Sequence, residues 1–205
     1  MAPSATLWLR ADVADAAAPS RRRTLLVAGP GLEYAADEVH ALAALYDDAI
    51  VLTGADAGVE PVAEALQLCA RAHLACRGSF RADNPQFSAL MLADGPLAVH
   101  DIESLSAAPQ QLILSACDSG RAVVRAGDEL MGLTSALLAI GAGTIAASTV
   151  AVPDAPPRPF MLELHRRLQA GAAPAAALAD ARTAIIGHGD AGRVARDAFV
   201  CLGAG

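Results

Sequence analysis

The sequence contains no lysine, and all fifteen of its basic residues are arginine. Schiff-base chemistry and the lysine of a phosphate-binding P-loop are therefore excluded. The 22 acidic residues outnumber the 15 basic ones, which gives a formal net charge of −7. A nucleic-acid-binding surface needs clustered cations, so this balance argues against nucleic acid as a partner. Charged residues make up only 18% of the chain and hydrophobic residues 54%, which excludes a disordered chain.

Cysteine is also scarce. The four cysteines are Cys69, Cys76, Cys117 and Cys201, and none of them forms a CxxC pair. Zinc is not expected, because only Cys69 and His73 have ligand-like spacing and no second pair completes a site. The N-terminus carries no signal-peptide pattern, so we expect reduced thiols and a cytoplasmic location. The sequence implies no metal and no cofactor.

One long apolar run raises the question of a membrane span. Residues 130–153 contain no charged residue, and a spanning helix needs about 20 apolar residues. However, Gly141 and Gly143 divide the run, and threonine and serine recur through it. We therefore interpret the run as a buried helix followed by a buried strand, and expect no membrane contact.

The first 23 residues are interpreted as an N-terminal extension or linker, and apolar strands then alternate with helical patterns. Strands are predicted at 24–28, 50–52, 72–76, 110–116, 144–150 and 198–202, helices at 35–46, 58–69, 127–140, 159–170 and 174–186, and a hairpin at 90–92 and 97–99. This alternation predicts an α/β domain over residues 24–205, with a mostly parallel sheet and helices on both faces. Ligands of such folds bind beyond the carboxyl ends of the strands.

Two predicted strands end in segments that contain cysteine and glycine, CRG at 76–78 and SACDSG at 115–120. A thiol nucleophile suits such a strand end, because glycine lets backbone N–H groups approach and form an oxyanion hole. A buried cysteine that only fills space is the common alternative. The residues alone leave both interpretations open.

These segments resemble a known family. HLACRG at 73–78, followed by LILSACDSG at 112–120, is similar to the CHAT domain, a family of caspase- and separase-related cysteine peptidase domains. Further parts of the pattern match in the same order: GPGL at 29–32, GDEL at 127–130, VPD at 152–154 and AFV at 198–200. The resemblance extends from about Thr24 to Gly205 and implies a caspase-like fold.

Domains of this family use a histidine–cysteine dyad at the ends of two neighbouring strands. The resemblance implies that Cys117 is the nucleophile and that Gly78 supplies an oxyanion-hole N–H. It also implies that Arg77 occupies the position of the catalytic histidine. Arginine stays protonated and cannot accept the thiol proton, although its charge stabilises a thiolate. We therefore expect peptidase activity to be lost or strongly reduced, and the domain to bind or regulate a protein or peptide partner.

Other histidines offer alternatives for an active cysteine endopeptidase. His188 lies in a Gly-rich segment, and an extended strand would put His73 ~13 Å from position 77. His73 is better explained as a satisfied core histidine. His40, His100 and His165 are expected to be surface residues.

Two carboxylates are weaker candidates for substrate binding. Asp118 directly follows the expected nucleophile, and Asp154 follows the next strand. Each would favour a basic residue in the substrate, or is only a turn residue.

Besides an impaired peptidase homologue and an active endopeptidase, a third interpretation is an interaction domain that keeps Cys117 only for packing. Because domains of this family commonly follow helical repeats, a helical-repeat protein is a candidate partner, and the sequence leaves open whether the chain is a fragment.

Overall fold

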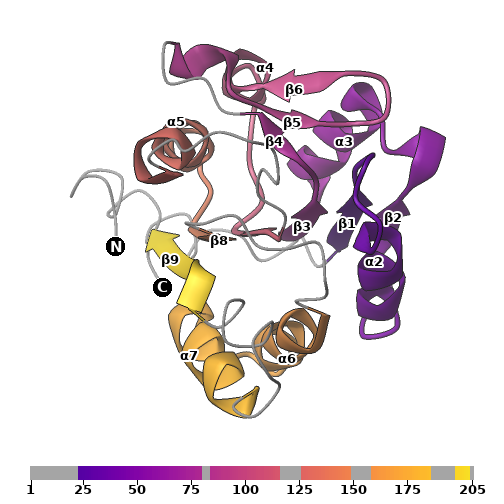
Figure 1. Cartoon of the computed structure of the whole chain (residues 1–205), viewed down its shortest axis with the longest axis vertical. Helices are drawn as coiled ribbons and strands as arrows, with labels where there is room; N and C mark the ends of the chain where they lie inside the picture. Colours follow the sequence, from indigo (N-terminus) through magenta and orange to yellow (C-terminus); the bar gives the residue numbers. More distant parts are fainter. Residues whose placement is uncertain (1–22, 80–83, 116–125, 149–157, 186–196, 204–205) are drawn as a thin grey trace.

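This computed structural model describes residues 23–79, 84–115, 126–148, 158–185 and 197–203 of the chain. Its main sheet has the strand order β2-β1-β3-β7-β8-β9 (Figure 1). The β8–β9 pair is antiparallel, and every other neighbouring pair in this sheet is parallel. The predicted α/β fold with a mostly parallel sheet is therefore confirmed. Its strands are β1 (Thr24–Ala28), β2 (Ile50–Leu52), β3 (Arg71–Ala75), β7 (Gln111–Leu114), β8 (Thr144–Ser148) and β9 (Phe199–Gly203).

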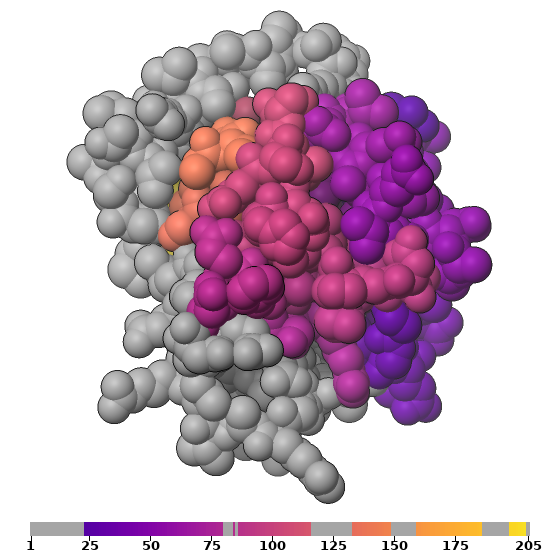
Figure 2. All heavy atoms as spheres, turned by 90° about the horizontal axis from the view of Figure 1, so that it is seen from above, coloured from indigo at the N-terminus to yellow at the C-terminus, as the bar shows by residue number. Residues whose placement is uncertain are grey.

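A small antiparallel sheet branches from the end of β3. It contains β4 (Gly78–Ser79), β5 (Ala89–Met91) and β6 (Pro96–Ala98), in that order. The predicted hairpin corresponds to β5 and β6. Figure 2 shows this pink segment beside the violet segment of η1 and α3. Two hydrogen bonds join them, from Ala93 N–H to the Ala57 carbonyl at 2.9 Å and from Val59 N–H to Asp94 Oδ1 at 2.8 Å.

Helices cover both faces of the main sheet (Figure 1). They are α2 (Ala35–Ala43), α3 (Val59–Leu68), α4 (Val99–Glu103), α5 (Ala126–Ala139), α6 (Arg158–Gln169) and α7 (Pro174–Ala184), with the short 3₁₀ helices η1 (Gly54–Asp56) and η2 (Pro85–Phe87). The long uncharged run forms part of α5 and then β8, as predicted. Among the described helices, none combines the length and apolarity that a membrane crossing requires.

Successive side chains of a strand point to opposite faces, so each buried strand contributes to two cores. On one face a single apolar cluster forms against α3 and α5, and it includes Leu25, Leu74, Leu112, Ile145, Leu66 and Leu137. The other face is divided into two apolar clusters. One packs against α2 and includes Leu26, Ala75, Val39 and Leu42; the other packs against α6 and α7 and includes Ile113, Ala146, Phe160 and Phe199.

Candidate functional site

The two strand ends singled out by the sequence lie side by side. β3 and β7 are neighbouring parallel strands, with Leu74 opposite Leu114. Ser115 N–H donates to the Leu74 carbonyl at 3.2 Å, so the pairing continues past the end of β7. The segment after β3 and the segment after β7 therefore leave the sheet at the same edge.

The structure describes only one side of this predicted site. Arg77 and Gly78, which follow β3, are described. Four other sequence-predicted residues lie outside the described part of the chain: Cys117, Asp118, Asp154 and His188. Along the chain, Arg77 is the third residue after Leu74, and Cys117 is the third residue after Leu114.

Arg77 presents an exposed side chain at the end of β3. Its guanidinium lies against the turn between β1 and α2, where a Cβ added to Gly31 would be 3.9 Å from Arg77 Cζ. Gly31 has φ +76°, a conformation that glycine adopts without strain. The turn therefore reaches the arginine with no side chain between them.

The backbone after Arg77 is held by the small sheet. The Arg77 carbonyl accepts a hydrogen bond from Met91 N–H at 2.8 Å, and Gly78 is paired with Leu90. Gly78 is buried. This pairing fixes the direction in which Arg77 leaves the main sheet.

Cys76 lies between β3 and Arg77 but is fully buried. A Cβ added to Gly29 would be only 3.1 Å from Cys76 Cα, so the β1 turn covers this thiol closely. Burial raises the pKa of Cys76 to about 12, although a hydrogen bond from the Gly29 backbone partly opposes the shift. A thiol in this state is a poor nucleophile at neutral pH.

We expect Cys76 to resist alkylation in the folded protein. A pKa of about 12 leaves ~10⁻⁴ of the thiol ionised at pH 8, against roughly a quarter for a free cysteine, so its reaction should be ~10³-fold slower. Treatment with iodoacetamide at pH 8, followed by peptide mapping, measures the rate, with the urea-unfolded chain as reference. Equal Cys76 rates in the folded and unfolded chains would contradict the prediction.

His73 is confirmed as a core histidine. It is fully buried on β3, and both ring nitrogens have partners: Nε2 is 2.9 Å from Glu38 Oε1, and Nδ1 is 3.0 Å from His165 Nε2. Neither nitrogen is available to a substrate at the strand end.

The expectation that His165 is a surface residue is wrong. It is fully buried on the inner side of α6, where Nδ1 is 2.7 Å from the Tyr46 hydroxyl. The sequence contained a signal for this, because His165 follows Met161 by four residues and precedes Leu168 by three. That spacing puts it on the apolar stripe of the helix.

His40 and His100 are exposed, as expected. His100 lies on α4, where Nε2 is 3.2 Å from Asp101 Oδ1 and the ring packs edge-on against Phe87. Within the described ranges, no group of three histidine, cysteine, aspartate or glutamate side chains is arranged to hold a metal ion.

The comparisons with known proteins agree with this geometry. The model of the CHAT domain family matches residues 2–193. A similar solved structure is the Arg-specific cysteine proteinase gingipain R, with a TM-score of 0.63 and 14% sequence identity. That match covers 89% of this chain and 46% of gingipain R, so the chain spans less than half of that protein and the likeness concerns the fold. No curated protein sequence matches the chain.

Proposed function

The chain belongs to the CHAT domain family and is a homologue of caspase-like cysteine peptidases, and we propose that it is a catalytically impaired member that works by binding a protein or peptide partner. In this proposal Cys117 is the retained nucleophile and Arg77 replaces the histidine base. The supporting observation is the exposed Arg77 at the end of β3, beside the strand that leads to Cys117. A guanidinium stays protonated at neutral pH and cannot accept a thiol proton.

The described histidines provide no substitute base near Arg77. His73 and His165 are buried and bonded to each other, and His100 is paired with Asp101 on α4. His40 lies in the last turn of α2, and that helix begins next to the β1 turn and runs away from it. An active endopeptidase would therefore need His188, which lies outside the described residues.

In this proposal the same site determines which chemical groups the partner presents. Gly78 would offer a backbone N–H to a partner carbonyl. Asp118 and Asp154 would favour a basic residue of the partner, and a helical-repeat protein remains the candidate partner. An interaction domain in which Cys117 has only a packing role would bind that partner equally well after Cys117→Ala.

We expect the natural chain to produce no Cys117-dependent cleavage of peptides. The natural chain and Cys117→Ala should be incubated with a proteome-derived peptide library, and the products compared by mass spectrometry. Identical product sets agree with the proposal, because loss of general acid–base help costs ~10²–10⁴-fold in rate.

Cuts that the natural chain makes and Cys117→Ala does not would overturn this proposal in favour of an active endopeptidase. The His188→Ala variant would then identify the base. If that variant lost the cuts, His188 would be the substitute base; unchanged cuts would remove it from the scheme.

A further inference from the structure

A series of hydrogen-bonded polar side chains crosses the face of the sheet that α2 and α6 cover. It contains Arg71 and His73 of β3, His165 of α6, Tyr46 just after α2 and Glu38 of α2, and we call this set the polar seam. The successive distances are 3.0 Å from Arg71 Nη1 to the Tyr46 hydroxyl, 2.7 Å to His165 Nδ1, 3.0 Å from His165 Nε2 to His73 Nδ1, and 2.9 Å from His73 Nε2 to Glu38 Oε1. The α2 cluster and the α6–α7 cluster occupy the same face of the sheet as the seam.

The end groups of the seam set the direction of every hydrogen bond. Arg71 can only donate, and the Glu38 carboxylate can only accept. His73 donates its Nε2–H to Glu38, so the Nδ1 of a neutral His73 accepts from His165 Nε2–H. His165 Nδ1 is then bare and accepts from the Tyr46 O–H, while the Tyr46 oxygen accepts from Arg71. With one proton on each imidazole, every bond in the seam is satisfied.

Arg71 is held firmly at its end of the seam. Its Nε donates to Gln111 Oε1 of β7 at 2.8 Å, and its Nη2 donates to the Leu168 carbonyl of α6 at 3.2 Å. The guanidinium also lies 5.6 Å from the centre of the Tyr46 ring. The seam therefore connects β3 and β7 to α2 and α6.

A further proton on the histidine pair would reverse the hydrogen bond at the Tyr46 end of the seam. If His165 Nδ1 were protonated, it would have to donate to the Tyr46 oxygen, and the Tyr46 O–H would lose its acceptor. Burial, and then the nearby His73 and Arg71, hold the pKa of His165 well below its usual value. Burial raises the pKa of Tyr46 against the opposing effect of Arg71, which keeps the hydroxyl protonated as a donor.

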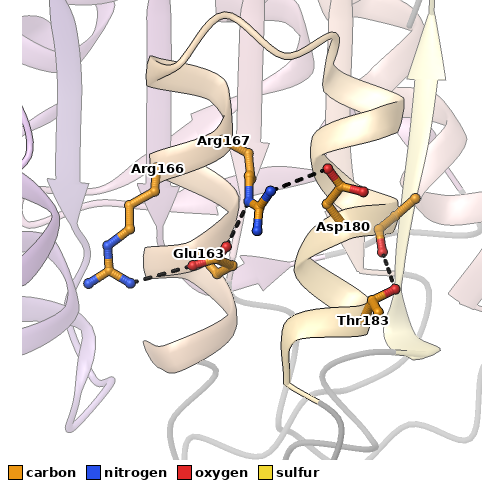
Figure 3. Close-up of polar contacts among 6 residues, drawn as sticks. Glu163, Arg166, Arg167, Asp180 and Thr183 are labelled. Carbon is orange, nitrogen blue, oxygen red and sulfur yellow. Dashed lines mark hydrogen bonds and ion pairs between the residues drawn. The ribbon is translucent and has the colours of Figure 1, made fainter.

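Four further charged groups of α6 and α7, namely Glu163, Arg166, Arg167 and Asp180, are paired with one another at the surface (Figure 3). Arg167 Nε is 2.7 Å from Glu163 Oε1, Arg166 Nη1 is 3.5 Å from Glu163 Oε2, and Arg167 Nη1 is 3.6 Å from Asp180 Oδ2. Arg182 of α7 donates to the Phe199 carbonyl. Within the described residues, His165 contacts Tyr46 and His73, and Arg71 lies close enough to lower its pKa, so the charged and titratable neighbours that act on it belong to the seam.

We propose that the polar seam is an acid-operated latch, in which protonation of the histidine pair breaks the one-way hydrogen-bond chain and releases α2 and α6 from β3. The folded state keeps His165 unprotonated at a pH where an unfolded histidine, with a pKa of about 6.5, already binds a proton. This contribution to stability is therefore complete above that pH and is lost as the pH falls below it. The latch is independent of whether the site at Arg77 cleaves or only binds.

The proposed hydrogen bonds predict the tautomers of His73 and His165, which can be measured without substituting any residue of the seam. Two-bond ¹H–¹⁵N correlation of the ¹⁵N-labelled chain at pH 7.5 should show His73 and His165 each with the proton on Nε2 and a bare Nδ1. Signals of the remaining histidines are assigned with His40→Gln, His100→Gln and His188→Gln. A proton on Nδ1 of His165 or His73 at this pH would overturn the proposed chain of bonds.

The release itself is measured by hydrogen exchange at pH 7.5 and 5.5, corrected for the intrinsic rates. An open state that binds one proton with a pKa of about 6.5 becomes ~10-fold more populated over this interval. We therefore expect α2 and α6 to lose about tenfold more protection than α3, which packs on the other face. His165→Gln should abolish this difference, and His40→Gln, the same change at an exposed position, should preserve it.

Equal losses of protection in α2, α6 and α3 of the natural chain would overturn the latch. So would a tenfold difference that persists in His165→Gln. If His165→Gln does not fold, the comparison of helices within the natural chain and the histidine tautomers decide the question without it.

Discussion

Replacing Arg77 with histidine is expected to create Cys117-dependent peptide cleavage, with a gain of ~10²–10⁴-fold over the natural chain. An imidazole can take the thiol proton and return it to the leaving amine, whereas a guanidinium stays protonated through both steps. The strand register supports this pairing of positions. Leu74 lies opposite Leu114, and Arg77 and Cys117 are each three residues further along their own segments.

The substitution should leave the fold intact. The Arg77 side chain is exposed. Gly31 of the β1 turn has no side chain, so the turn leaves room for an imidazole in place of the guanidinium. The backbone hydrogen bond from Met91 N–H to the Arg77 carbonyl does not depend on the side chain. Near-UV circular dichroism of the variant should therefore match that of the natural chain.

Two controls separate the possible causes of a gain. Arg77→Gln removes the charge without supplying a base, and we expect it to remain inactive. The double variant of Arg77→His with Cys117→Ala should lose every new cut. Cleavage is measured on the same peptide library by mass spectrometry. A folded Arg77→His chain that cuts no peptide would rule out the loss of one residue as the reason for inactivity.

Much of the fold was predictable because its strands are short runs of apolar residues buried on both faces. The strand at 24–28 and the helix that follows it match β1 and α2 closely. β4 and α4, which have two and five residues, were not predicted. Elements of that length are too short to show a hydrophobic period, and β4 exists only because β5 pairs with it.

The candidate site was predictable only where it follows from chain order. The positions of Arg77 and Gly78 follow directly from the end of β3. The burial of His165 was also predictable from its place on the apolar stripe of α6, which the expected surface position ignored. Glu38 carries the same signal: it lies one residue before Val39 and four before Leu42, both buried on the inner face of α2.

The contacts between these polar residues could not be read from their spacing. Tyr46 and His165 are 119 positions apart in the chain, and His73 and His165 are 92 apart. A polar side chain on an apolar stripe indicates that it needs a buried partner, but not which one. The partner is determined by which helices the parallel strands bring to the same face.

Gly203→Ala is expected to lower the free energy of unfolding by more than ~4 kcal/mol, a size that needs a specific steric cause. A Cβ at this position would overlap the Gly143 carbonyl oxygen, and it would lie 3.2 Å from Thr144 Cα. That backbone cannot easily move away. Gly143 N–H and Thr144 N–H both donate to the Gln110 carbonyl, at 3.0 and 2.8 Å. The change would therefore force β9 away from β8.

Gly141→Ala provides a matched control for this prediction. Gly141 has φ +102° and Gly203 has φ +100°, so alanine suffers the same backbone strain at both positions. A Cβ at Gly141 meets no atom within 4 Å, so only the strain of ~1–3 kcal/mol should remain. Urea denaturation of both variants measures the difference, which is the cost of the clash alone. Equal losses of stability would mean that β9 can move away from β8 without cost. The antiparallel β8–β9 pairing at the edge of the sheet would then not contribute to stability at Gly203.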